Sequence, residues 1–141
     1  VMAIDANNPV VQFCTEGMQA EGEGRLVDAK ALFTRAWEAS TDTYDACIAA
    51  HYLARHQETD EETLRWNEIA LERADQTEVS RLREFYPSLL LNVGNSHETL
   101  GKKTMARSFY ERAAAIVETL PPGPYGDLVR DGVARALART D

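Results

Sequence analysis

The chain has 141 residues, of which 44% are hydrophobic, 27% charged and 8% aromatic. This composition excludes a disordered or collagen-like chain and predicts one domain that buries its own core. The formal net charge of −8 disfavours nucleic acid and anionic membrane surfaces as partners. No apolar run is long enough to span a bilayer, and the first residues lack a basic segment followed by an apolar one. We therefore expect a cytoplasmic protein.

Hydrophobic residues recur at spacings of three and four through most of the chain, which predicts an all-α fold. The expected helices, in chain order, span residues 9–22, 27–40, 44–56, 61–74, 77–100, 104–119 and 125–138. Asn8 suits the N-cap of the first helix and Pro9 its first position, while Thr59 or Asp60 suits the N-cap of the fourth.

The fifth expected helix, residues 77–100, is the longest and contains Pro87. A proline inside a helix costs about 3 kcal/mol, because it removes a hydrogen bond and clashes with the preceding turn. Two outcomes are therefore open. The helix bends at Pro87, or Pro87 opens a new helix after a short one.

The two cysteines, Cys14 and Cys47, both lie within apolar helical patterns. A reduced thiol at such a position behaves as a small hydrophobic side chain, and a cytoplasmic location disfavours a disulfide. Cys14 has no cationic neighbour in the sequence that would lower its pKa. We therefore expect both cysteines to be buried and neither to act as a nucleophile.

The sequence contains no phosphate-binding glycine loop and no nucleophile elbow, so we expect no enzyme and no cofactor. His51, His56 and His97 fall on the third and fifth expected helices, which should be neighbours. A zinc or iron site formed by His51, His97 and Glu98 is conceivable. The chain has no His-x-x-x-His or Glu-x-x-His pair, however, so we expect no metal and rank a His/Glu metal-binding protein last.

The most informative feature of the chain is an internal repeat. Two sets of five small or aromatic residues recur with the same successive offsets of 7, 5, 4 and 3. The sets are Gly17, Gly24, Ala29, Phe33 and Ala36, and Gly94, Gly101, Ala106, Tyr110 and Ala113. Glycine and alanine let two helices cross closely, and an aromatic ring fills the space beside them. The repeat therefore predicts two helix pairs with the same packing.

Residues 10–43 and 87–120 resemble the tetratricopeptide repeat, and residues 45–52 and 85–92 resemble segments of small stand-alone bacterial proteins of this type. The resemblance implies a right-handed α-solenoid of antiparallel helix pairs in a single domain, residues 1–141. Its expected parts are repeat units at 10–43, 44–77 and 78–120 and a capping helix at 124–139. The middle unit is degenerate, although His51 follows Gly17 by 34 residues, the period of the family.

The resemblance also implies a non-catalytic adaptor or scaffold that binds a protein or peptide. In such a solenoid the first helix of each pair lines a concave face, where a peptide can lie. The residues that we expect in this groove are Met18, Asp45, Ile48, Tyr52, Arg55, His56, Leu91, Asn92, Asn95 and Glu98. Cys14 and Met18 stand where a chaperone-binding clamp of this family would need Lys and Asn, so that particular partner is not expected.

A homo-oligomeric structural protein is the alternative function. In that case the long fifth helix, or an exposed Trp37 or Trp66, would form the interface of a homodimer. The sequence leaves both functions open.

Overall fold

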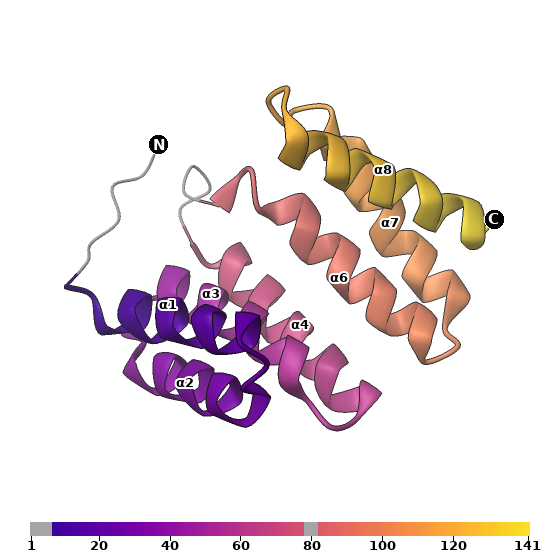
Figure 1. Ribbon diagram of the computed structural model, residues 1–141. Coiled ribbons are helices and arrows are strands. Elements are labelled where there is room, and N and C mark those ends of the chain that lie inside the picture. The colour runs from indigo at the N-terminus through magenta and orange to yellow at the C-terminus, as the bar shows by residue number, and fades with distance from the viewer. Residues whose placement is uncertain (1–6, 78–81) are drawn as a thin grey trace. The chain divides into compact units, whose positions relative to one another are not determined.

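The computed structural model describes residues 7–77 and 82–141, which contain helices and turns and no strand. The all-α prediction is therefore confirmed for the described residues. Their helices are α1 (Pro9–Gly22), α2 (Leu26–Ala39), α3 (Thr43–Leu53), the 3-10 helix η1 (Ala54–His56), α4 (Asp60–Asp75), α6 (Tyr86–Thr99), α7 (Lys103–Val117) and α8 (Pro124–Arg139) (Figure 1). None of these helices has both the length and the apolar character that crossing a membrane requires.

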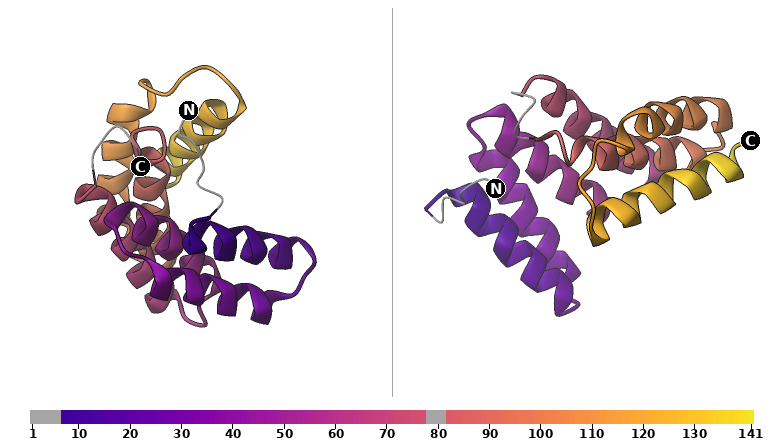
Figure 2. Two further views of the ribbon diagram at one scale, coloured as in Figure 1. Left: turned by 90° about the vertical axis from the view of Figure 1, so that its left-hand side faces the viewer. Right: turned by 90° about the horizontal axis from the view of Figure 1, so that it is seen from above.

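The chain divides into two compact units, residues 1–81 and 82–141. In the first unit α1 packs mainly against α2, and α3 packs mainly against α4. In the second unit α6 packs against α7, and α8 contacts both of them. Figures 1 and 2 show α1 beside α2 and α6 beside α7, each pair joined by a short turn. This pairing of consecutive helices is consistent with a helical repeat.

Side-chain caps fix the starts of three helices. The Asn8 side chain accepts a hydrogen bond from the Val10 amide at 2.9 Å, which confirms the predicted cap of α1. Thr59 caps α4 in the same way by accepting from the Glu62 amide, and Asp42 caps α3. These bonds matter because the first amides of a helix have no partner within the helix.

The prediction of one continuous helix over residues 77–100 is wrong. Residues 83–85 form a turn, and α6 begins at Tyr86 with Pro87 in its first turn. Of the two outcomes left open, Pro87 therefore lies near the start of a new helix. Proline is tolerated there because the amide that it lacks would have no intrahelical partner. Residues 78–81, which belong to the predicted helix, lie outside the described residues.

The first glycine and the aromatic residue of each predicted set form the same contact in the two units. A Cβ atom added at Gly17 would overlap the ring of Phe33, and one added at Gly94 would overlap the ring of Tyr110. Both rings are fully buried. Ala29, Ala36, Ala106 and Ala113 are also fully buried. The absence of a side chain at each glycine thus lets a ring of the next helix lie directly on the backbone.

The turn between the helices of each pair is also repeated. Gly24 and Gly101 have φ values of +77° and +79°, in the left-handed region that favours glycine. After each glycine the next amide reaches back to a carbonyl of the preceding helix, from Arg25 to Ala20 and from Lys102 to His97, both at 2.8 Å. These are the bonds of a Schellman-type helix end.

The two tryptophans are not exposed, in contrast to the expectation for a dimer interface. Trp37 and Trp66 are both half-buried against the core of the first unit. Their rings contact each other edge to face, with centroids 5.1 Å apart. The guanidinium of Arg73 lies 5.6 Å from the Trp37 ring. Both indole rings therefore make packing contacts within the first unit.

Candidate functional site

An opening of about 230 Å³ lies between α1 and α3 of the first unit. We call it the α1/α3 opening. Its lining residues are Val10, Val11, Cys14, Thr15 and Met18 from α1 and Tyr44, Asp45, Ile48 and Tyr52 from α3. Four of them, Met18, Asp45, Ile48 and Tyr52, belong to the predicted groove. The structure thus brings together four of the six groove residues predicted from the first and third expected helices.

One lining residue of the α1/α3 opening, Tyr52, belongs to an aromatic stack. The Tyr52 ring lies parallel to the Phe33 ring of α2, with centroids 4.9 Å apart and an angle of 9° between the planes. The Arg55 guanidinium lies 4.7 Å from the centroid of Tyr52. Burial raises the pKa of Tyr52, so its hydroxyl is neutral near pH 7. Tyr52 therefore supplies an apolar ring and a neutral hydroxyl.

Asp45 is the one charged side chain among the described residues that line the α1/α3 opening. It lies in the first turn of α3 and is only 8% exposed. Its Oδ2 atom accepts a hydrogen bond from Asn8 Nδ2 at 3.1 Å, and its amide donates to the cap residue Asp42 at 2.8 Å. The start of a helix favours a negative charge, so a carboxylate is tolerated at this buried position.

Cys14 is a buried, unpaired thiol, as predicted, and so is Cys47. Burial, with a smaller contribution from the charge of Asp45, raises the pKa of Cys14 to about 11. The thiol is therefore protonated near neutral pH, and a thiol is a far weaker nucleophile than a thiolate. In the α1/α3 opening, Cys14 acts as a small apolar surface.

Two predicted groove residues, Arg55 and His56, are paired with Glu21 and do not line the α1/α3 opening. Arg55 donates to one oxygen of Glu21, and His56 Nε2 lies 2.5 Å from the other. The His56 ring also packs near Phe33, with centroids 5.5 Å apart. Arg55 and His56 instead line a wide groove of about 770 Å³ beside α2. Leu26 at the start of α2 lines the same groove.

The predicted groove residues of the second unit are engaged in internal contacts. The Tyr110 hydroxyl lies 2.8 Å from Asn95 Oδ1 and 2.7 Å from Glu98 Oε1, and its single proton can be donated to either. Glu98 also accepts two bonds from Arg139 of α8, at 3.0 and 3.1 Å. Hydrogen bonding to Arg139 lowers the pKa of Glu98. Leu91 packs against the α7 and α8 residues of its own core, and Asn92 is half-buried.

A comparison of the two units shows a feature that we did not predict. Cys14 and Leu91 stand at the same place in the repeat, each three residues before the glycine that contacts the aromatic ring. The Leu91 side chain packs against the core of the second unit, whereas the smaller Cys14 lines an opening. A small residue in place of a leucine is the sequence signal that could have located this opening.

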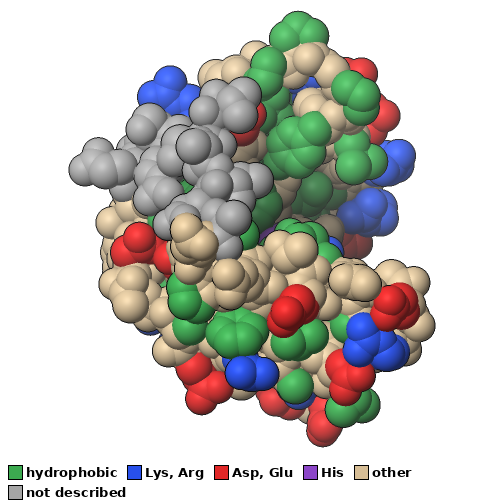
Figure 3. Space-filling model, turned by 60° about the vertical axis from the view of Figure 1, so that its left-hand side comes forward, with side chains coloured by type: hydrophobic (Ala, Val, Ile, Leu, Met, Phe, Trp, Pro, Cys, Tyr) green, Lys and Arg blue, Asp and Glu red, His purple; other side chains and the backbone are tan. Residues whose placement is uncertain are grey.

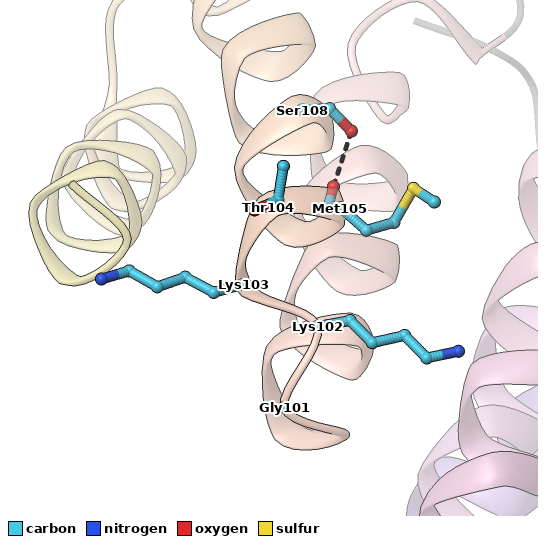
Figure 4. A pocket seen from close by; sticks show the side chains of 6 residues that line it. All are labelled: Gly101, Lys102, Lys103, Thr104, Met105 and Ser108. Carbon is cyan, nitrogen blue, oxygen red and sulfur yellow. Dashed lines mark hydrogen bonds between the residues drawn. The ribbon is translucent and has the colours of Figure 1, made fainter.

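A second hollow, of about 610 Å³, lies at the start of α7. It is lined by Gly101, Lys102, Lys103, Thr104, Met105 and Ser108. Figure 4 shows the side chains of Lys102 and Lys103 pointing in opposite directions. Lys103 donates to the backbone oxygen of Asp141 at 3.1 Å. The two ammonium groups therefore do not converge on one position, as a phosphate site would require.

The histidines do not form a metal centre in the described part of the chain. His51 and His56 belong to the first unit and His97 to the second. His97 is stacked on Phe109, with ring centroids 5.5 Å apart. Among residues 7–77 and 82–141, no group of three His, Cys, Asp or Glu side chains is arranged to hold a metal ion.

No model of a known protein family matches the chain, and no curated protein matches it in sequence.

Proposed function

We propose that the protein is a non-catalytic module of the tetratricopeptide type that binds a peptide segment of another protein in the α1/α3 opening. In this proposal the helix pairs form a right-handed solenoid with α8 as its cap, and the protein works in the cytoplasm as an adaptor. The observation that carries the proposal is the opening itself, because it combines apolar walls with a few hydrogen-bonding groups.

The polarity of the surface supports a peptide rather than a membrane as the ligand. On the face drawn in Figure 3, hydrophobic side chains are interspersed with charged and polar ones. A membrane-binding surface would combine a broad apolar face with lysines and arginines, whereas this chain carries a net charge of −8. A peptide offers apolar side chains and backbone hydrogen bonds together, which matches the lining of the α1/α3 opening.

A selection from a phage library of random peptides about twelve residues long tests the proposal. The full chain is immobilised, and we expect the recovered peptides to share a consensus. Cys14→Leu should abolish their recovery, because the larger side chain would occupy the opening, much as Leu91, at the same place in the repeat, packs against the core of the second unit. Gln19→Leu is the control, since it adds the same side chain at an exposed position of α1 outside the opening.

A second variant, Ile48→Glu, blocks the opening from α3 and should have the same effect as Cys14→Leu. Thermal unfolding followed by circular dichroism verifies that each variant is folded. If the folded Cys14→Leu and Ile48→Glu variants recover the same peptides as the original protein, the α1/α3 opening is not the binding site. A selection that yields no consensus also contradicts the proposal.

A further inference from the structure

We propose that the ligand of the α1/α3 opening is a peptide in which a hydrophobic side chain is accompanied by a neighbouring lysine or arginine. This inference rests on the proposed function and adds the chemistry that the ligand must have. The hydrophobic side chain enters the opening, and the cation pairs with the carboxylate of Asp45.

The size of the opening fits one large hydrophobic side chain. Its volume of about 230 Å³ exceeds that of an engineered cavity of about 150 Å³ that binds benzene. The walls that such a side chain would contact are formed mainly by Val10, Cys14, Ile48 and the ring of Tyr52. An aromatic ring or a branched aliphatic group can therefore be accommodated without displacing the stack of Tyr52 on Phe33.

The carboxylate of Asp45 in the opening favours a cationic ligand. Asp45 is nine-tenths buried, and the only hydrogen bond to its carboxylate that the structure shows in the described chain comes from the neutral amide of Asn8. None of the ion pairs formed within residues 7–77 and 82–141 involves Asp45. The start of α3 offsets part of this charge, and a nearby cation would offset the remainder.

Arg55, the one arginine or lysine in α3 and η1, does not pair with Asp45. Arg55 extends over the ring of Tyr52 and is held by Glu21, so its charge is already paired. Together with burial, which is the larger cause, the negative charge of Asp45 raises the pKa of the Cys14 thiol. Asp45 and Cys14 both line the α1/α3 opening, so a ligand that fills it meets both side chains.

Two labelled versions of a peptide from the selection test this inference. One carries the original lysine or arginine, and in the other this residue is replaced by glutamine. Their dissociation constants for the full chain are measured by fluorescence anisotropy. We expect the glutamine peptide to bind about tenfold more weakly, which is at the lower end of the effects measured for close charge pairs across an interface.

The corresponding change in the protein is Asp45→Asn, which keeps an acceptor for Asn8 and removes the charge. This variant should bind both peptides with the same, weakened affinity. Asp42→Asn is the matched control, because it removes the same charge three residues earlier, outside the opening, and asparagine caps a helix as well as aspartate does. Asp42→Asn should retain the tenfold preference for the cationic peptide.

The outcomes distinguish this inference from the proposed function. A consensus without a basic residue, or equal binding of the two peptides to the original protein, overturns the inference. If the Cys14→Leu variant still fails to bind these peptides, the proposed function stands. If Cys14→Leu binds them as well as the original protein does, both the inference and the proposed function are wrong. The comparison of the two peptides needs only the original protein, so it decides the question even if Asp45→Asn does not fold.

Discussion

Gly17 of α1 lies so close to the ring of Phe33 in α2 that a Cβ atom at this position would overlap the ring. The same relationship joins Gly94 and Tyr110 in the second unit. In both units the glycine therefore sets the distance between the two helices of a pair. The same Phe33 ring also stacks on Tyr52, which lines the opening between α1 and α3.

Gly17→Ala and Gly94→Ala should each destabilise the protein by about 1–3 kcal/mol, because the added methyl group forces a buried ring to move. The free energy of unfolding is measured by urea titration. A different effect is expected at Gly22, where an added Cβ has no neighbour within 4 Å. Gly22→Ala should be neutral or stabilise the protein by up to about 1 kcal/mol.

The comparison with Gly22 separates packing from helix propensity, because all three glycines lie within α-helices. If Gly17→Ala and Gly94→Ala are as stable as Gly22→Ala, the rings of Phe33 and Tyr110 do not lie on the glycine backbone. The interpretation of the repeated residues would then be wrong.

The sequence predicts most of the helices and the packing of each pair because these features depend on local patterns. Residues three and four apart determine a helix face, and the glycine and aromatic positions of one pair are separated by only sixteen residues. The start of α6 was harder to predict. Val79, Leu82 and Phe85 continue the helical spacing, and Pro87 is compatible with either a bend or a first turn, so the sequence alone gives no reason to place a break at residues 83–85.

The candidate site could be predicted only in part, for a physical reason. Asp45 and Tyr52 occupy one face of α3, and periodicity is enough to identify that face. The pairing of Arg55 and His56 with Glu21 depends on how two helices meet in space. The opening itself depends on the volumes of the side chains around it, such as that of Cys14 at the place where the second unit has Leu91, and helix periodicity does not report volume.

Protonation of His51 should destabilise the protein in mild acid. Burial lowers the pKa of His51 to about 4, with a further contribution from the charge of Arg55, compared with about 6.5 in an unfolded chain. The unfolded state therefore binds a proton more readily than the folded state. Stability is highest above pH 6.5 and decreases as the pH falls towards 4, by up to about 3 kcal/mol from this group.

Urea titrations at several values between pH 5 and 7 measure this dependence. His51→Gln removes the titrating group, so its free energy of unfolding should vary less over the same range, although Gln itself can lower the stability at every pH. Above pH 5 most carboxylates of the chain remain ionised, which limits their contribution. Parallel curves for the two proteins would contradict the low pKa of His51.

The two thiols should react slowly with alkylating reagents. Burial raises the pKa of Cys14 to about 11 and that of Cys47 to about 12. Near pH 7.5 the thiolate fraction of Cys14 is then about 300-fold lower than that of an ordinary cysteine with a pKa near 8.5. Iodoacetamide labelling followed by peptide mass spectrometry measures the rate at each cysteine, and the same protein in denaturant provides the reference. Equal rates in the folded and denatured protein would show that the thiols are accessible and ordinary.

The hydroxyl of Tyr110 should stabilise the second unit through Glu98. The phenol lies 2.7 Å from the carboxylate, and the carboxylate is also bound by Arg139 of α8, so this contact links all three helices of the unit. Tyr110→Phe leaves the fully buried ring in place and removes only the hydrogen bond. We expect a loss of about 1–2 kcal/mol, as is typical for a hydrogen bond to a charged group that is partly exposed.

A double-mutant cycle isolates this bond from the other interactions of the two residues. Tyr110→Phe, Glu98→Gln and the double variant are compared by urea titration, and we expect a coupling energy of about 1 kcal/mol. Asn95 also lies within reach of the hydroxyl, so the same cycle with Asn95→Ala determines which of the two acceptors receives the hydrogen bond. A larger coupling with Glu98 than with Asn95 is expected, because a carboxylate is the stronger acceptor. Additive effects for the Tyr110 and Glu98 pair would contradict this assignment.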